Sequence, residues 1–348
     1  MQGIGIVGTG LIAKHQARAI GTLEGARLVA VMSRDGERAR EFAREFGCKA
    51  YADEQEFLSD PNVSIVSICT PSGSHMESAV AAADAGKHLM IEKPLEVTLD
   101  RCDRIIDAAH RHGVTLGGVF QSRYFESSGL IRTAIERGRF GRLVLADAYV
   151  KWFRPQSYYD QGGWRGTCLL DGGGALMNQS IHAIDLLQWY MGPVESVQAV
   201  TATLGHERIE VEDTAVATVR FRNGALGVIE GSTATYPGFL KRIEISGTAG
   251  SVIQEEEDLK TWTFSEEEAG DEDIRLQHST LTGSGGGASD PGAIGMAGHR
   301  RQFADFIRTI ERGTPYELNG EEARKPVAIV LAIYESAANG RPVAVSTP

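Results

Sequence analysis

The sequence has few of the features that mark specialised classes of protein. Only four of its 348 residues are cysteines (Cys48, Cys69, Cys102 and Cys168), and no two of them form a CxxC pair. This scarcity argues against a disulfide scaffold or a cysteine zinc site, and it favours a reducing, cytoplasmic location. No apolar run approaches the roughly 20 residues that a membrane helix needs, so we expect no membrane partner.

Positive charge is also scarce. Lys and Arg number 35 against 46 Asp and Glu, which leaves a formal net charge of -11. Because a phosphate backbone calls for a basic face, this balance argues against a nucleic-acid partner. The sequence also lacks a basic stretch followed by an apolar one near Met1, so no signal peptide is predicted.

The composition is otherwise that of an ordinary globular protein, and the length suits two domains. Over residues 1–121, short apolar strands alternate with amphipathic helices. This alternation predicts a doubly wound parallel sheet of the Rossmann type. The expected strands lie at 3–8, 27–32, 63–70, 88–92 and 115–120.

The rhythm changes over residues 122–348. Longer segments with partial alternation and short turns predict a largely antiparallel open sheet with flanking helices, an α+β domain. Apolar alternation in this sheet suggests association through one face, so we expect a homodimer or homotetramer. The expected strands lie at 143–152, 194–204, 214–221, 225–235, 242–246, 251–255 and 260–264. The expected helices lie at 175–191, about 298–312 and 320–339, and a loop rich in Gly and Ser is expected at 282–298.

A glycine turn follows the first expected strand. Residues 8–13 read Gly-Thr-Gly-Leu-Ile-Ala, a GxGxxA pattern in which Gly8 permits a tight turn and Gly10 a close approach of the backbone to a pyrophosphate. Ala13 permits close helix packing, and the helix that starts at Leu11 and Ile12 offers free N–H groups to phosphates. A plain structural turn is the alternative, but the position in the first strand–helix unit favours a dinucleotide cofactor.

The end of the second expected strand bears on which cofactor is used. A carboxylate there would bind the ribose 2′-hydroxyl of NAD. The sequence instead has Ser33 and Arg34, with Arg38 one turn later, and these side chains suit a 2′-phosphate. Asp35 nearby and the possibility of ordinary surface arginines weigh on the other side, and the balance favours NADP over NAD.

Two further motifs carry candidate chemistry. Glu92, Lys93 and Pro94 follow a strand at the carboxyl edge of the sheet, where a lysine can donate to a reacting oxygen. On the helix expected at 175–191, Asn178 and His182 share a face, and the histidine can take a hydroxyl proton. The alternatives are a solvated lysine and a structural histidine.

Together these motifs resemble the glucose–fructose oxidoreductase/inositol dehydrogenase (Gfo/Idh/MocA) family. The segments that carry the resemblance are the GxGxxA turn, CTPSGSH at 69–75, EKP at 92–94, GGGALMNQSIHAIDLLQW at 172–189 and RPV at 341–343. The resemblance covers nearly the whole chain. It implies a Rossmann domain, a sheet domain that often mediates dimers or tetramers, and NAD(P)-linked hydride transfer on sugars, cyclitols and related compounds.

The family's EKP lysine matches Lys93 and its helix histidine matches His182, so these are the predicted catalytic residues. Many members carry Asp where this chain has Asn178, and Asn resembles the branch that acts on sugar nucleotides and glycosides, often at a pyranose 3-hydroxyl. The expected cofactor-binding residues are Gly8, Gly10, Leu11, Ile12, Ser33, Arg34, Arg38, Thr70, Pro71, His75, Glu92 and Lys93. The expected substrate-binding residues are Lys93, Arg123, Tyr158, Arg165, Asn178 and His182.

Several alternatives stay open. Asp185 either orients His182 or forms a structural ion pair, and without a third ligand at fixed spacing no metal site is predicted. The sequence predicts an NAD(P)-dependent oxidoreductase acting on a carbohydrate-like hydroxyl or ketone, in either direction. A non-catalytic, nucleotide-sensing regulator on the same fold is the alternative, and the presence of Lys93 and His182 argues against it.

Overall fold

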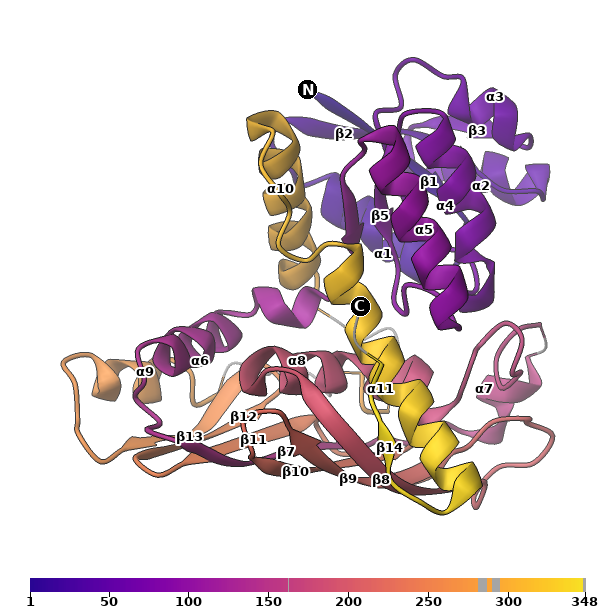
Figure 1. Ribbon diagram of the computed structural model, residues 1–348. Helices are drawn as coiled ribbons and strands as arrows, with labels where there is room; N and C mark the ends of the chain where they lie inside the picture. Colours follow the sequence, from indigo (N-terminus) through magenta and orange to yellow (C-terminus); the bar gives the residue numbers. More distant parts are fainter. Residues whose placement is uncertain (162, 281–286, 290–294, 347–348) are drawn as a thin grey trace. The chain divides into compact units, whose positions relative to one another are not determined.

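The computed structural model in Figure 1 describes residues 1–161, 163–280, 287–289 and 295–346. The chain divides into two compact units, the first made of Met1–Gln121 with Met296–Arg324 and the second of Ser122–Gly295 with Lys325–Pro348. We expected all of 122–348 to lie in the second domain, whereas 296–324 belong to the first unit. The loop expected at 282–298 lies largely outside the described residues.

The first unit is built on a six-stranded parallel sheet in the order β3-β2-β1-β4-β5-β6. The central strand β4 is buried at every residue, as expected for a parallel sheet that is covered on both faces. The strands are β1 (Gln2–Val7), β2 (Ala26–Met32), β3 (Lys49–Tyr51), β4 (Ile65–Ile68), β5 (His88–Ile91) and β6 (Leu116–Gly118).

Local sequence sets the ends of the connecting helices. The Asp35 side chain accepts the N–H groups of Glu37 and Arg38 at the start of α2, and Gly47 ends this helix in the left-handed conformation. Thr98 caps α5 in the same way as Asp35 caps α2. The helices are α1 (Leu11–Ile20), α2 (Gly36–Phe46), α3 (Glu54–Leu58), α4 (His75–Asp84) and α5 (Leu99–His112).

A late segment of the chain completes the first unit. Helix α10 (Ala297–Arg312) packs against α1, and Gln302 on α10 donates to the carbonyl of Gly118 at 2.7 Å. The backbone N–H of Gly118 in turn donates to Leu318 O at 3.2 Å. Gly117 has no side chain because a Cβ there would lie 2.7 Å from the Tyr316 ring. The end of β6 is therefore covered by residues that come almost 200 positions later.

The second unit contains an eight-stranded sheet in the order β13-β12-β11-β7-β10-β9-β8-β14. The β7–β10 pair is parallel, and the other described pairs are antiparallel. The strands are β7 (Leu143–Lys151), β8 (Val194–Ala202), β9 (Thr214–Phe221), β10 (Leu226–Ser232), β11 (Arg242–Gly247), β12 (Gly250–Glu255), β13 (Asp258–Phe264) and β14 (Val343–Ala344).

Helices cover one face of this sheet. Along β9 every second residue from Ala215 to Phe221 is buried, and the residues between them are exposed. Figure 1 shows α6 and α8 lying over one face of the sheet. The helices of this unit are α6 (Glu126–Glu136), α7 (Gln156–Asp160), α8 (Ile181–Met191), α9 (Asp271–Gln277) and most of α11 (Gly320–Asn339).

The predicted fold class is confirmed for both sheets. The sequence pattern missed strands β3 and β14 and helices α3, α6, α7 and α9, of which all but α6 are seven residues or shorter. Such short elements carry too few residues for a periodic pattern to stand out. Within the described part of the chain, no helix is long and apolar enough to cross a membrane.

Candidate active site

The glycine turn of the first unit is open at one position and filled at another. Gly8 has φ of +107°, and a Cβ there would lie 2.6 Å from the carbonyl oxygen of Cys69, so only glycine fits. Gly10 has φ of -73°, and no described atom lies within 4 Å of where its Cβ would be. The open space at Gly10 is what close approach of a ligand to the backbone requires.

Helix α1 begins directly after this opening. No described side chain caps the helix, which leaves its first N–H groups available to an anion. Ala13 is fully buried against the sheet, while Leu11 at the first helical position is mostly exposed and Ile12 is half-buried. The turn therefore fits the pyrophosphate of a dinucleotide, with Gly8, Gly10, Leu11 and Ile12 around it.

The end of β2 presents a mixed group of polar residues. Ser33 accepts from the backbone N–H of Asp35 at 3.3 Å, and Arg34 is exposed. Asp35 caps α2 and forms an exposed ion pair with Arg38 at 3.5 Å. The carboxylate of Asp35 is therefore occupied by the start of its own helix, and Ser33 is the first residue beyond the strand.

The loops after β4 and β5 are joined by a buried histidine. Nδ1 of His75 lies 3.0 Å from Pro94 O, and Nε2 lies 3.1 Å from Thr70 O. Burial lowers the pKa of His75, and the nearby charge of Glu96 opposes this effect. Pro71 precedes the short 3-10 turn Ser72–Ser74 that leads into α4. His75 thus links the two loops that carry Thr70 and Lys93.

A series of hydrogen-bonded polar side chains leads to the backbone of Lys93 at the end of β5. Ser67 Oγ donates to Gln16, whose Nε2 donates to Glu92 at 2.5 Å, and the other Glu92 oxygen accepts the N–H of Lys93 at 3.2 Å. Burial raises the pKa of Glu92, and the charge of Lys93 and the hydrogen bond from Gln16 oppose this rise. Lys93 itself is partly exposed and precedes a cis peptide bond to Pro94.

In the second unit the predicted helix at 175–191 has two parts. Residues Ala175–Ser180 form a π-helix, here called the π turn, and α8 continues from Ile181. We expected one α-helix with Asn178 and His182 four residues apart on one face. The structure inserts the wider turn before α8, and Ser180 Oγ donates to Ala175 O at 2.7 Å across it. Such turns are rare and are frequently found at functional sites.

Asn178 lies in a chain of side-chain hydrogen bonds. Its Nδ2 donates to Oδ1 of the buried Asp171, whose Oδ2 accepts the N–H of Gly166 at 2.8 Å. Oδ1 of Asn178 accepts from Gln179 Nε2 at 3.0 Å. These contacts fix which end of the amide carries oxygen, because Asp171 can only accept and Gln179 Nε2 can only donate.

This series of hydrogen bonds continues from Gln179 to aromatic and cationic side chains. Gln179 Oε1 accepts from the buried Arg154 at 2.9 Å, and Gln179 Nε2 also approaches the Tyr158 hydroxyl at 3.2 Å. The guanidinium of Arg165 lies 4.7 Å from the centre of the Tyr158 ring and 5.0 Å from that of Trp164. Tyr158, Arg165 and Asn178 are thus part of one connected group in the second unit.

Arg123 lies elsewhere in that unit. Its guanidinium forms a two-pronged ion pair with Asp185, at 2.6 and 2.8 Å, in which both side chains are buried. Of the two roles considered for Asp185, the structure shows the structural ion pair. Arg123 also lies 5.2 Å from the ring of Trp189. These contacts give Arg123 a packing role beneath α8.

His182 lies on the first turn of α8 and is partly exposed. Sequence reasoning missed residues that form hydrogen bonds with the π turn or with one another beside it, namely Asp171, Gln179, Arg154, Glu212 and Tyr334. Only Gln179, which adjoins Asn178, had a signal in the local sequence. Among the described residues, no group of three or more His, Cys, Asp or Glu side chains is placed to hold a metal ion.

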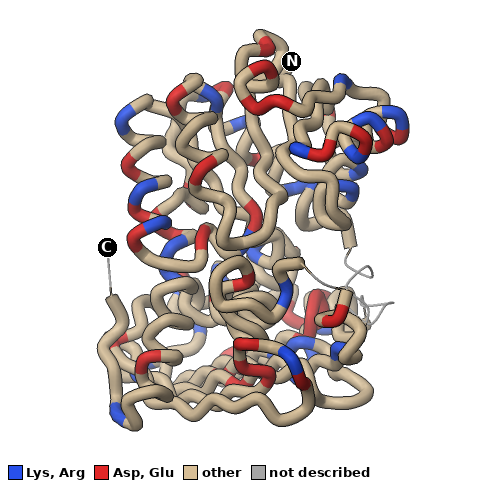
Figure 2. The backbone as a smooth tube through the Cα atoms, turned by 90° about the vertical axis from the view of Figure 1, so that its right-hand side faces the viewer, with Lys and Arg blue, Asp and Glu red and all other residues tan. Residues whose placement is uncertain are grey.

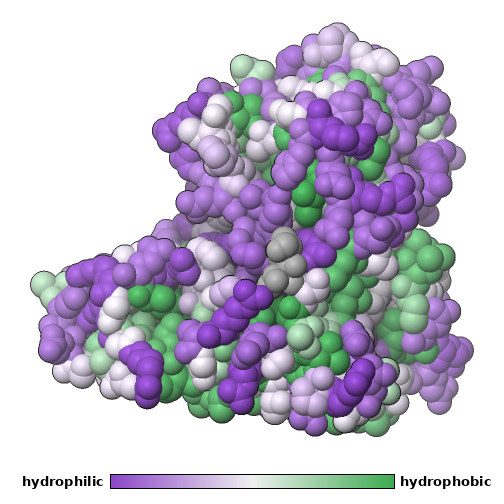
Figure 3. Space-filling view, in the orientation of Figure 1, coloured by the Kyte–Doolittle hydropathy of each residue, from purple (hydrophilic) through white to green (hydrophobic). Residues whose placement is uncertain are grey.

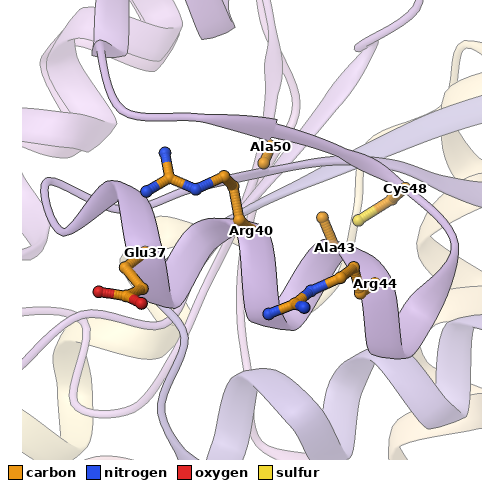
Figure 4. A pocket seen from close by; sticks show the side chains of 6 residues that line it. All are labelled: Glu37, Arg40, Ala43, Arg44, Cys48 and Ala50. Carbon is orange, nitrogen blue, oxygen red and sulfur yellow. The ribbon is translucent and has the colours of Figure 1, made fainter.

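A surface pocket of about 490 Å³ lies along α2 and β3. Figure 4 shows its lining residues, which are Glu37, Arg40, Ala43, Arg44, Cys48 and Ala50. None of the predicted cofactor residues lines it, so we do not assign it to the active site. Figure 2 shows basic and acidic residues interleaved along the helices of the first unit, without a continuous basic stripe in that view.

The parallel sheet and the open glycine turn define a nucleotide-binding protein of the Rossmann class. The profile described as an oxidoreductase family with an NAD-binding Rossmann fold matches residues 2–119, and that of the GFO/IDH/MocA C-terminal domain matches residues 130–253. The chain belongs to the Gfo/Idh/MocA family. It is an NAD(P)-dependent oxidoreductase that acts on CH–OH groups.

Relatives align along most of the chain. Myo-inositol 2-dehydrogenase of Thermotoga maritima is 29% identical over 98% of this chain and 97% of its own. Levoglucosan dehydrogenase of Pseudarthrobacter phenanthrenivorans is 30% identical over 87% and 85%. The WlbA dehydrogenase of Bordetella pertussis, solved with NADH and UDP-GlcNAcA, is 33% identical, with a TM-score of 0.90 over 100% of this chain and 98% of that one.

Proposed function

We propose that the enzyme transfers a hydride between a nicotinamide cofactor and a ring hydroxyl or ketone of a sugar or sugar derivative, at C3 of a pyranose. The observation that carries this proposal is the connected amide pair of Asn178 and Gln179, on the π turn that leads into His182. An amide group suits the hydroxyls of a neutral ring, because it carries donors and acceptors and no charge. The relatives named for inositol, levoglucosan and UDP-GlcNAcA support a carbohydrate-like substrate.

The proposed roles follow from the chemistry of each side chain. When bound, the nicotinamide supplies the hydride acceptor or donor. In the oxidising direction His182 takes the proton of the reacting hydroxyl. Lys93 donates a hydrogen bond to the same oxygen and stabilises its developing negative charge. The polar chain from Gln16 through Glu92 to the N–H of Lys93 holds that lysine at the end of β5.

The presence of Asn at position 178 affects which side chain can act as the base at the reacting hydroxyl. Many family members have Asp at this position, and an amide cannot share a proton as that carboxylate does. The nearby carboxylate of Asp171 accepts from Asn178 and from the N–H of Gly166. We infer that Asp171 orients the amide and that His182 is the single base at the reacting hydroxyl.

We also propose that NADP is preferred over NAD. Ser33 stands where a carboxylate would bind the ribose hydroxyl, and Arg34 beside it is exposed. Asp35 is engaged by the N–H groups of Glu37 and Arg38 at the start of α2. A 2′-phosphate would therefore meet a hydroxyl and a guanidinium at the end of β2.

The deciding experiment measures NAD(P)H absorbance with a panel of pyranosides, sugar nucleotides and cyclitols, in both directions. We expect Lys93→Ala and His182→Ala each to lower kcat on the order of 100-fold or more, while calorimetry shows that both variants still bind the cofactor. Thr248→Ala, in the β11–β12 turn, is the matched control and should keep full activity. Unchanged kcat in Lys93→Ala would remove this lysine from the mechanism, and oxidation at another carbon, read by NMR of the product, would overturn C3.

The outer face of the second sheet supports self-association. Leu145, Val216 and Leu226 lie on neighbouring strands β7, β9 and β10, and each is between 44% and 49% exposed. Figure 3 shows hydrophobic side chains among hydrophilic ones on the part of this unit that it displays. We propose that the chain forms a homodimer or homotetramer through this face.

Light scattering tests the association. We expect a dimer or tetramer for the wild type and a lower mass for the double variant Val216→Asp, Leu226→Asp. Leu276→Asp changes a leucine on α9 that is more exposed, at 71%, and it should leave the mass unchanged. A monomeric wild type would refute the proposal.

A further inference from the structure

A buried glutamate anchors the start of the π turn. Glu212, just before β9, accepts the N–H of Gly174 at 2.9 Å through Oε2 and the N–H of Leu176 at 2.8 Å through Oε1. Oε1 also accepts from the Tyr334 hydroxyl at 2.9 Å, and the backbone oxygen of Glu212 accepts the N–H of Ala175 at 3.1 Å. One residue thus satisfies three successive N–H groups that the start of a helix leaves without partners.

The glycines before the π turn fit closely against this anchor. A Cβ on Gly174 would lie 1.9 Å from the backbone oxygen of Glu212, and a Cβ on Gly173 would lie 2.1 Å from the Tyr334 hydroxyl. Both distances are far below contact distance, so the backbone at 173–174 packs directly on Glu212 and Tyr334. The absence of side chains here allows the anchor to reach the backbone.

The anchored N–H groups belong to the turn that carries Asn178. The N–H of Asn178 donates to Gly174 O at 3.2 Å, so the position of Gly174 sets that of Asn178. A π turn is rare, and contacts from outside the helix can stabilise it. Glu212 supplies such contacts from a different segment of the chain.

We propose that Glu212 is a positioning residue that holds the π turn and thereby sets the placement of the Asn178 amide relative to His182. Tyr334 on α11 assists by holding one oxygen of the Glu212 carboxylate. This proposal rests on the proposed function, because it assigns the anchor a part in the same hydride transfer. Neither side chain touches the substrate in this scheme, and both act through the backbone of the turn.

The charge of Glu212 suits this task. Burial raises its pKa, and hydrogen bonds from Leu176, Gly174 and Tyr334 oppose that rise. Three donors converge on two oxygens, which is an arrangement that a carboxylate satisfies and an amide does not. In Glu212→Gln the new NH2 group would face an N–H or O–H donor, so the start of the turn would lose a contact and shift.

The test compares three variants by steady-state kinetics, thermal unfolding and hydrogen exchange of the segment 172–182. Glu212→Gln disturbs the anchor, and Tyr334→Phe removes one donor but keeps the carboxylate. Asp271→Asn is the matched control, because Asp271 is a buried carboxylate of the same unit that accepts from Arg139, Trp262 and the N–H of Glu268. It lies at α9, next to the edge strand β13, and the partners just named lie outside the π turn.

We expect Glu212→Gln to lower kcat on the order of 10- to 100-fold, since a small misplacement of a substrate-orienting group has effects of this size. Its cofactor affinity should be unchanged, and exchange in 172–182 should be faster. Tyr334→Phe should show a smaller loss of kcat with little change in Tm. Asp271→Asn should lower Tm without changing kcat or exchange in 172–182.

Other outcomes would overturn the proposal. If Glu212→Gln lowers Tm as Asp271→Asn does but keeps wild-type kcat and exchange, Glu212 only stabilises the fold. If Glu212→Gln does not fold, Tyr334→Phe decides, and unchanged kcat and exchange in that variant reject the anchor. If the wild type transfers no hydride to any sugar, the proposed function fails by itself, and unchanged exchange in 172–182 of Glu212→Gln then rejects the anchor independently.

Discussion

The two units each start a functional helix with a glycine-rich turn, but the glycines serve opposite purposes. At Gly10 nothing lies within 4 Å of where a Cβ would be, so glycine leaves room for a ligand that comes from outside. At Gly174 the room is already taken by the backbone oxygen of Glu212. The first turn is open at Gly10, although Gly8 packs on the backbone of Cys69, and the second turn is filled by the protein itself.

The two turns illustrate two ways in which a protein backbone can prepare a binding site. An open turn with free N–H groups costs little stability and gains its partner only when a phosphate binds. A filled turn has its N–H groups already paired, so it contributes to the fold and holds side chains in place before any ligand arrives. Substitutions in the first turn should therefore affect binding, and those in the second should affect folding and turnover together.

The largest effect is expected from Gly174→Ala. The added methyl group would overlap a backbone oxygen, and overpacking of this kind destabilises by about 3 kcal/mol. Urea unfolding should show the loss, and kcat should fall with it because the π turn is displaced. Gly129→Ala, in α6 of the same unit with nothing within 4 Å, is the control and should be neutral or stabilising. Wild-type stability of Gly174→Ala would contradict the filled turn.

Gly10→Ala should have the opposite profile. Its φ of -73° suits alanine and its surroundings are empty, so the stability of the cofactor-free protein should change by less than about 0.5 kcal/mol. Calorimetry should show cofactor affinity reduced on the order of 10-fold, because the methyl group occupies the path of the pyrophosphate. Gly21→Ala, at the other end of α1, should change neither quantity. Unchanged affinity in Gly10→Ala would mean that the pyrophosphate lies elsewhere.

An effect of similar size, but on one cofactor alone, should distinguish NADP from NAD. Arg34→Gln removes a guanidinium next to Ser33, and we expect it to weaken NADP binding on the order of 10-fold while NAD binding is unchanged. Arg27→Gln, near the start of β2, is the control for the loss of a positive surface charge. Equal weakening of both cofactors, or stronger binding of NAD than NADP by the wild type, would reject the 2′-phosphate assignment.

The smallest effect is expected at a hydrogen bond between two side chains of the first unit, Tyr51 and Asp60, which lie outside the glycine turn. Tyr51 donates to Asp60 at 2.6 Å, and this bond, with the N–H of Asn62, lowers the pKa of Asp60 to about 2. The stabilisation is thus present above the ordinary pKa of 3.8 and is lost as pH falls through about 2. Tyr51→Phe should cost about 1 kcal/mol at pH 6 and less towards pH 2, as measured by urea unfolding. A cost that is independent of pH would contradict this coupling.

Most of the fold and part of the candidate site could be predicted from the sequence. Alternation of strands and helices predicted both sheets, because it depends on local periodicity that burial enforces. The open turn at Gly8 and Gly10 was recognisable for the same reason, since its function lies in the backbone of consecutive residues. Lys93 and His182 were found through motifs at strand and helix ends, and their catalytic roles stay predictions.

What the sequence could not reveal depends on contacts between distant segments. Glu212 meets the π turn from 36 to 38 positions away, and Tyr334 reaches Glu212 from 122 positions away. No local pattern marks such partners. The π turn itself was predicted as a regular α-helix, because the contacts that Glu212 and Tyr334 make at its start leave no trace in the local sequence. The pairing of Arg123 with Asp185 was hidden in the same way.

The late segment that covers β6 has a consequence for synthesis on the ribosome. Gly117 and Gly118 are made early, but their partners Gln302, Tyr316 and Leu318 follow only after the whole of Ser122–Gly295. At 5–20 residues per second this interval lasts on the order of 10 to 40 seconds. During that time the surface of the nascent first unit that α10 later covers stays exposed. Chaperones can bind this surface until α10 has been synthesised.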